Sequence, residues 1–365
     1  MRGVKWCVAG LLLVLAGGAA LAWWQREPLQ IWWVVRGLRQ APESDRPTWL
    51  SRLDSLGSAA IPSLMDALAD EATDAGPLAG LDHLAHAGHA GPLVEQISRG
   101  FSRFSSPTQA RLLGHVATWC DASAATPEFN ACCTRLLGAA VDGDTEVLAA
   151  GLTLAGRLMQ QAGDATTLTA VRELTGAALR CSQAETRLQA VRVALQPGLE
   201  MLEQVVGLLR DSSAEVRRAA ILAVGPAEQL VREDVLLPGL HDTDPEVRRL
   251  TEVALRGRGL RPEHLELGRL LTHPQPTTRL EVLDRIRDML DDQQSSDLDP
   301  GVWLRRLSHD HSPAVRAAAL RLMSQQSVID LTDRMDQMAR SDPSPTVSQL
   351  AAYYRRGKAA PAPER

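Results

Sequence analysis

The chain has 365 residues, of which 45% are hydrophobic but only 4% are aromatic. So few aromatic residues argue against an all-β sandwich or barrel, whereas the abundance of Ala, Leu and Arg suits closely packed helices. The 39 basic and 44 acidic residues give a net charge of −5, so the composition indicates no basic face for nucleic acid. We therefore expect a helical protein with no nucleic-acid partner.

An uncharged apolar stretch near the N-terminus has tryptophans at both ends, Trp6 before it and Trp23 and Trp24 after it. Trp6 to Trp24 is nineteen residues, close to the roughly 20 that a helix needs to cross the hydrocarbon core of a bilayer. Tryptophan also favours the membrane interface. The pattern predicts a transmembrane anchor at residues 6–24 behind a positive flank at residues 1–5.

Charge around this stretch predicts its orientation. Arg2 and Lys5 precede it without any acidic residue, and positive charge favours the cytoplasmic side. We expect a single-pass membrane protein with its body on the periplasmic or extracytoplasmic side. Two alternatives stay open: a cleaved signal peptide, for which residues 20–22 supply a small-x-small site, and a buried N-terminal helix.

Residues 25–42 form a second unusual segment. It contains the apolar stretch Leu29 to Val35, with Arg26, Arg36 and Arg39 on its flanks. Such a segment is typical of an amphipathic juxtamembrane helix that lies in the membrane interface.

Beyond residue 42 the sequence repeats itself. Aligned segments such as DSSAEVRRAAILAVG from Asp211 and DTDPEVRRLTEVAL from Asp242 share an arginine six residues after their first residue. Intervals of 30 to 37 residues separate these register positions, a period that indicates stacked pairs of helices. The register positions are Arg187, Arg217, Arg248, Arg279, Arg316 and Ser348. We expect a repeat array over residues 43–356, followed by a short disordered tail at residues 357–365.

This pattern resembles the HEAT repeat family, particularly its short bacterial type that includes the phycobilisome-lyase-like branch. The motif D-x-x-x-x-V-R-x-x-A-x-x-x-L carries the resemblance from Cys181 to about Tyr354, and A-I-P-x-L-x-x-x-L-x-D carries it in residues 56–70. Between Thr73 and Arg180 only helical pairing remains. The resemblance implies an all-α fold, an α-solenoid of stacked antiparallel helix pairs of the HEAT or armadillo type.

The resemblance also implies that the Arg of one repeat reaches the loop Asp of a neighbour, forming a ladder along the array. The expected ladder residues are Asp211, Arg217, Asp242, Arg248, Asp310 and Arg316. The alternative is a row of arginines that binds an anionic partner. We favour the structural role, because nearly every Arg comes with an Asp that neutralises it.

The second, Leu-rich helices of the repeats carry charges on their outer faces. The resemblance implies that these helices share one concave surface, which would run from acidic to basic along the array and could orient a partner. The candidate partner-binding residues are Glu233, Glu266, Arg269, Arg305 and Arg306. An ordinary solvated face explains the same charges equally well.

Residue types that carry chemistry are sparse. His83, His86 and His89 form the one dense cluster of possible metal ligands, but no Cys or Glu accompanies them at a zinc-site spacing, and a polar helix end is the simpler interpretation. The sequence lacks G-x-S-x-G and the phosphate-binding G-x-x-x-x-G-K-[ST]. It also lacks the His-Glu dipeptides that hold iron in the HEAT-like deoxyhypusine hydroxylases.

Four cysteines outside the N-terminal segment leave two interpretations open. Cys120 could bridge to the Cys132–Cys133 pair in an oxidising compartment, or all four, Cys181 included, could be small buried residues at helix interfaces.

The function expected from the sequence is therefore a non-catalytic, membrane-anchored HEAT-repeat scaffold that binds another protein and needs no cofactor. The alternative is an enzyme or enzyme accessory, lyase-like or metal-binding, that uses the region around His83 and His86.

Overall fold

The computed structural model describes residues 26–69, 75–122, 126–161, 164–291, 300–325 and 330–359. This part of the chain contains helices and no strand, as the sequence predicts. The predicted flank at residues 1–5 and anchor at residues 6–24 lie outside the described residues, as does most of the predicted tail. The chain forms two compact units, one up to Val205 and one from Val206, and each is described separately below.

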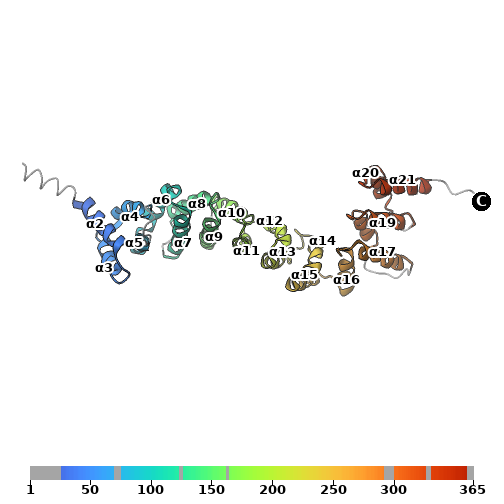
Figure 1. Ribbon diagram of the computed structural model, residues 1–365, viewed down its shortest axis with the longest axis horizontal. Coiled ribbons are helices and arrows are strands. Elements are labelled where there is room, and N and C mark those ends of the chain that lie inside the picture. The colour runs from blue at the N-terminus through green and yellow to red at the C-terminus, as the bar shows by residue number, and fades with distance from the viewer. Residues whose placement is uncertain are drawn as a thin grey trace, which may run out of the picture. The chain divides into compact units, whose positions relative to one another are not determined.

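The first unit is a double row of helices (Figure 1). Helices α6, α8 and α10 pack side by side in one row, and α7, α9 and α11 pack side by side in the other. Neighbouring helices therefore bury each other's apolar faces, which is the packing of a helical repeat array. The helices of this unit are α2 (Arg26–Gln40), α3 (Arg46–Leu53), η1 (Gly57–Ala60), α4 (Ile61–Ala69), α5 (Ala75–Leu84), η2 (Ala85–His89), α6 (Ala90–Gly100), η3 (Phe101–Arg103), α7 (Ser106–Ala122), α8 (Pro127–Ala140), α9 (Thr145–Gln160), α10 (Ala165–Ala178) and α11 (Ala184–Ala194), with α12 (Leu202–Val206) at the boundary.

Local sequence explains where the long helices of this unit begin. Asp144 caps α9 by accepting hydrogen bonds from the backbone N–H groups of Glu146 and Val147. Asp164 caps α10 in the same way. A side-chain oxygen at this position satisfies N–H groups that the first turn of a helix leaves without a partner. The caps lie in the stretch where the repeat motif is weak, so helical pairing persists there without the D-x-x-x-x-V-R signature.

The connection between α5 and α6 differs from a simple helix end. The five residues of η2 form a π-helical turn that joins the two helices, and Gly88 within it has φ +95°. Only glycine adopts this left-handed conformation at low cost. The first of the two helices therefore ends at this turn, and Gly91 already belongs to α6.

Helix α2 belongs to the packed body. Its Val34, Val35 and Leu38 are buried, and it packs against α3, α4 and α5. The contact with α5 is close: a Cβ on Gly76 would lie 2.3 Å from the carbonyl oxygen of Leu38. The packed helices therefore begin before residue 43, the expected start of the array.

The second unit repeats one arrangement of helices. The helices that carry the register positions pack along one another, α13 with α15, and α19 with both α17 and α21. The helices are η4 (Gly207–Arg210), α13 (Ala214–Val224), α14 (Glu233–Leu236), η5 (Leu237–His241), α15 (Pro245–Gly257), α16 (Pro262–Leu271), α17 (Pro276–Asp291), α18 (Pro300–Leu307), α19 (Pro313–Gln325), α20 (Thr332–Ser341) and α21 (Pro345–Ala359).

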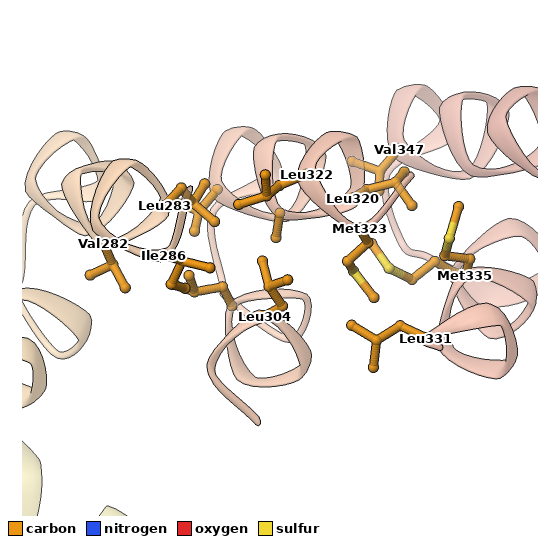
Figure 2. Close-up of a cluster of buried hydrophobic side chains, with 14 of the residues drawn as sticks. Val282, Leu283, Ile286, Leu304, Leu320, Leu322, Met323, Leu331, Met335 and Val347 are labelled. Atoms are coloured by element: carbon orange, nitrogen blue, oxygen red, sulfur yellow. The ribbon is translucent and has the colours of Figure 1, made fainter. Parts of the chain in front are cut away.

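Aliphatic and methionine side chains from successive repeats form the core of the second unit (Figure 2). Ile286 of α17, Leu304 of α18 and Leu320 of α19 are fully buried there. Met323 and Met335 continue the same core toward the last repeat. Each repeat thus completes its core with side chains of the next one.

Candidate functional site

The five arginines at the register position share one local arrangement. In each, Nη1 donates hydrogen bonds to the backbone carbonyls six and five residues earlier, at distances of 2.6 to 3.2 Å. These carbonyls belong to the loop before the helix, so the arginine ties the loop to the helix that follows it. The arrangement occurs at Arg187, Arg217, Arg248, Arg279 and Arg316. Arg111 lies six residues after the start of the related segment SSPTQARLLGHVATW, and it bonds to the carbonyl oxygen of Pro107 and the hydroxyl of Thr108.

Arg217, Arg279 and Arg316 also hold a carboxylate of the next repeat with their remaining edge, Nε and Nη2. The bonds are 2.7 and 2.6 Å from Arg217 to Asp242, 2.7 and 2.8 Å from Arg279 to Asp310, and 2.9 and 2.8 Å from Arg316 to Asp342. Paired N–H donors in this geometry are among the strongest polar contacts in proteins. We call these three ion pairs the rungs of the ladder.

The rungs are largely removed from water, and the last pair is the most buried, with side-chain exposures of 7% for Arg316 and 2% for Asp342. Burial alone would raise the pKa of the Asp342 carboxyl. Hydrogen bonds from Arg316 and from the backbone N–H of Ser344 outweigh that effect and hold the pKa below its ordinary value. Asp242 and Asp310 have lowered pKa values for the same reasons.

The ion pairs of the ladder join an Arg to the Asp of the next repeat, not to the Asp of its own repeat. Arg217 bonds to the carbonyl oxygen of Asp211 but to the carboxylate of Asp242. The Asp211 carboxylate accepts the backbone N–H of Ser213, and each loop aspartate makes this turn contact in its own repeat.

Arg248 is the exception among the register arginines of this unit. It keeps both carbonyl bonds, to Asp242 and Thr243. The loop position that would supply its carboxylate is His273, and within the part of the chain that the structure describes Arg248 has no acidic partner. The ladder is interrupted here.

A second ion pair between repeats was not anticipated. Arg218 binds the Asp244 carboxylate at 2.6 and 3.1 Å, while Asp244 also caps α15 by accepting the N–H of Val247. The Arg218 guanidinium and this backbone bond lower the pKa of Asp244 to about 2. The tandem Arg217-Arg218 and the spacing Asp242-x-Asp244 were the available signals in the sequence.

The charges on the second helices are partly neutralised within the protein. Glu266 of α16 pairs with Arg285 of α17 at 2.6 Å, and Arg269 of α16 pairs with Glu252 of α15 at 2.6 Å. The other three candidates differ in exposure: Glu233 and Arg305 are exposed, whereas Arg306 is half-buried and burial lowers its pKa. Two of the five candidate partner-binding charges, Glu233 and Arg305, are thus exposed and form no ion pair with another described residue.

The histidines of the cluster bond to different partners. His83 Nε2 lies 2.7 Å from Asp54 Oδ1, and His86 Nδ1 lies 2.7 Å from the backbone oxygen of Asp82. His89 lies at the end of the π-helical turn. Within the described residues no three His, Cys, Asp or Glu side chains converge as metal ligands would.

Asp82 makes its own half-buried network instead. Its Oδ1 accepts hydrogen bonds from Trp119 Nε1 at 2.8 Å and lies 2.8 Å from His115 Nδ1. Burial would raise the pKa of Asp82, but the contacts to His115 and Trp119 outweigh it and lower the pKa. The network joins α5 to α7 and anchors the fully buried Trp119.

The described cysteines are free thiols. Cys120, Cys132 and Cys133 are buried, and Cys181 is half-buried. A hydrogen bond with the Cys120 thiol and burial both raise the pKa of Cys133, so this thiol is not activated as a nucleophile.

The described part of each unit contains a hollow. One, of about 690 Å³, is lined by residues of α6, α8 and α10 that include Glu95, Phe129 and Arg135. The other, of about 480 Å³, lies in the second unit beside Leu209, Asp234 and other side chains that include no His, Ser or Cys. The second lining therefore offers no nucleophile and base pair.

Helix α2 exposes an apolar surface opposite its buried side. Its residues Leu29, Trp32 and Trp33 are 56%, 55% and 50% exposed. Arg36 lies over the ring of Trp32, and Arg52 lies over the rings of Trp33 and Trp49, with cation-to-centroid distances of 4.4 to 5.0 Å. We call Leu29, Trp32, Trp33, Arg36 and Arg52 the α2 patch. No helix in the described part of the chain is long and apolar enough to cross a bilayer, and the predicted anchor is not among those helices.

Comparisons with known proteins identify the repeat. Residues 193–221 match a family described as a HEAT repeat associated with sister chromatid cohesion. No curated protein matches the sequence. One solved structure, titled as the crystal structure of an engineered protein, is 17% identical, with 90% of this chain and 99% of that chain covered and a TM-score of 0.28. The match at residues 193–221 confirms the HEAT repeat resemblance seen in the sequence.

Proposed function

We propose that this HEAT-repeat protein is a non-catalytic, membrane-anchored scaffold that binds another protein. The observation that carries the proposal is the ladder. Bidentate ion pairs between successive repeats fix the spacing of their helices, so exposed side chains recur at set intervals. Such a surface suits an extended protein partner.

Exposed residues of the second unit support a partner surface. Leu222 and Val253 are 62% and 54% exposed and occupy the same place in two successive repeats, five residues after Arg217 and Arg248. Exposed apolar side chains among charged ones are the usual composition of a protein interface.

The α2 patch supports membrane attachment. Tryptophan and arginine side chains together suit the headgroup region of a bilayer, and α2 directly follows the predicted anchor. With the N-terminus inside, the repeats would lie on the periplasmic or extracytoplasmic side.

Extraction tests the attachment. Native membranes washed with alkaline carbonate should retain the full chain in the pellet, and protease added to the outside of spheroplasts should cut the repeats. A mature chain released without residues 1–22 would show a cleaved signal peptide instead.

Affinity capture tests the scaffold. The full chain is captured from solubilised native membranes, and a partner found by mass spectrometry is then titrated as a purified protein. Arg305→Glu should weaken binding by about tenfold if the second helices form the surface, whereas Arg321→Glu, an equally exposed charge reversal on α19, should not. Metal analysis of the same preparation tests the catalytic alternative, since stoichiometric tightly bound metal would contradict a cofactor-free scaffold.

A further inference from the structure

Because the rung is interrupted at Arg248, the Nε and Nη2 donors of this residue hold no carboxylate within the described residues. We call this pair of donors the fork of the guanidinium. At Arg217, Arg279 and Arg316, Nε and Nη2 grip both oxygens of one carboxylate. Arg248 has the same carbonyl bonds at 2.7 and 3.1 Å, so its guanidinium is held from the same side. The ladder itself thus shows which group this edge of the guanidinium is placed to bind.

His273 keeps one of the two contacts that a loop aspartate makes, the turn contact within its own repeat. Its Nδ1 accepts the backbone N–H of Gln275 at 3.1 Å, as the Asp242 carboxylate accepts the N–H of Asp244 at 2.8 Å. With Nδ1 occupied as an acceptor, a neutral ring carries its proton on Nε2 and offers no second acceptor. His273 therefore keeps the turn contact but supplies no carboxylate for Arg248.

At Arg248, both the exposure of the side chain and the packing of the adjacent helices differ from those at the rungs. Arg248 is exposed, whereas Arg217 and Arg279 have side-chain exposures of only 11% and 12%. Helices α15 and α17, on either side of the gap, pack less closely than α13 with α15 or α17 with α19. The guanidinium of Arg248 is therefore open to solvent, unlike those of the rungs.

Nearby acids do not substitute for the missing one. Glu246 binds Arg249 at 2.6 Å, and Glu252 binds both Arg256 and Arg269 at 2.6 Å. Within the described residues no carboxylate is left to neutralise Arg248, which stays an oriented cation.

We infer that Arg248 binds an Asp or Glu side chain of the protein partner, which completes the interrupted rung from outside. The inference rests on the proposed scaffold function and names the chemistry of one contact. A planar fork fits a carboxylate with two parallel bonds. Because the carbonyl bonds already hold the guanidinium, binding orders fewer rotamers than an unrestrained surface arginine would require.

A carboxylate introduced at position 273 tests whether this position faces the guanidinium of Arg248. His273→Asp should place a carboxylate against Arg248, whereas His273→Asn keeps a turn acceptor without the charge. In the full chain labelled with ¹⁵N-arginine, the Nε–H of Arg248 should exchange quickly with solvent in the wild type and in His273→Asn, and slowly in His273→Asp. Fast exchange in all three would overturn the inference, because position 273 would then not face the fork.

Acetate serves as the carboxylate probe in the same preparation. Its titration should shift the Arg248 Nε–H resonance with saturation in the wild type and in His273→Asn, with an affinity about tenfold higher than in His273→Asp. The resonance of Arg249, whose carboxylate partner is within its own helix, should change little. A linear shift common to all arginines would contradict a built site, and tighter saturation by inorganic phosphate would show that the site selects phosphate.

The partner separates this inference from the scaffold proposal. His273→Asp should weaken the purified partner about tenfold while His273→Asn leaves its affinity unchanged. A partner that binds both variants equally overturns the role of Arg248 but leaves the scaffold standing. A chain that binds acetate as expected but captures no protein refutes the scaffold and the inferred partner contact, although the carboxylate site remains.

Discussion

At the scale of single residues, the register arginines Arg217, Arg279 and Arg316 divide their donors between two tasks. Nη1 bonds to the loop of its own repeat, and Nε and Nη2 bind the loop of the next. One side chain therefore sets both the shape of a repeat and its distance from its neighbour. Lysine could not do both, because a single ammonium group lacks the fixed fork.

Arg217 and Arg248 give a matched pair for measuring the rung. Arg217→Ala removes the carbonyl bonds and leaves Asp242 without its cation, which should lower the free energy of unfolding by about 2–3 kcal/mol. Arg248→Ala removes only the carbonyl bonds of an exposed side chain and should cost clearly less. Denaturant unfolding of both variants measures the difference, and equal losses would show that the rung adds nothing to stability.

The lowered pKa of Asp342 predicts an acid dependence. A carboxyl with a lower pKa in the folded state stabilises the fold above its unfolded pKa of about 3.9, and this contribution disappears as the pH falls through the folded value. Asp342→Asn should therefore be less stable than the wild type at pH 7, by about 2 kcal/mol, and the difference should shrink below pH ~4. Urea unfolding between pH 7 and pH 2 follows it. A gap that is constant with pH would mean that the carboxylate charge is not what stabilises the pair.

At the scale of helices, prediction succeeded where a short motif fixes local structure. The loop Asp and the following V-R mark the start of α13, α15 and α19, because the turn contact of the Asp and the carbonyl bonds of the Arg both involve neighbours in sequence. The second helices were harder to predict. Gly207 and the pair Pro238-Gly239 shorten them into brief α and 3₁₀ turns, and a Cβ at Gly239 would lie 2.4 Å from Thr251 Oγ1, a contact with the next helix that spacing alone does not show.

Part of the candidate site, the ladder, could also be predicted from the sequence. The Asp and Arg pattern gives Arg217, Asp242, Asp310 and Arg316 of the rungs, but the expected ladder included Arg248 and left out Arg279 and Asp342. His273 in place of aspartate is visible in the alignment. The exposure of Arg248 and the pairing of Glu266 with Arg285 depend on how helices from different repeats meet, which a repeat period does not specify. The same holds for Asp82 and Trp119, which are 37 residues apart in sequence.

Helix α2 offers a test of its place in the packed body. Gly76→Ala puts a methyl group against the Leu38 backbone, which cannot move away as a flexible side chain would. We expect the variant to lose stability by about 1–3 kcal/mol and to expose α2 to hydrogen exchange. Gly91→Ala is the control, because a Cβ there meets nothing within 4 Å. An undisturbed α2 in Gly76→Ala would mean that the helix is not docked on α5.

At the scale of the whole molecule, the packing is local in sequence. In the second unit α19 packs against α17, α18 and α21, and the core passes from one repeat to the next without a centre that all helices share. The stability of such an array is close to a sum of repeat and nearest-neighbour terms. Damage to one repeat should therefore spread to its neighbours and fade with distance along the chain.

Arg316→Ala tests this locality. The variant removes the most buried rung, so hydrogen exchange should accelerate in α18 to α21, by about tenfold or more where exchange proceeds through local opening. Protection in α7 and α9 of the first unit should stay as in the wild type, because their contacts are with each other and with their own neighbours. Arg321→Ala, an exposed substitution on the same helix, should leave both regions unchanged. If protection fell equally in both units, the chain would unfold as one cooperative body, and the nearest-neighbour description of its repeats would be wrong.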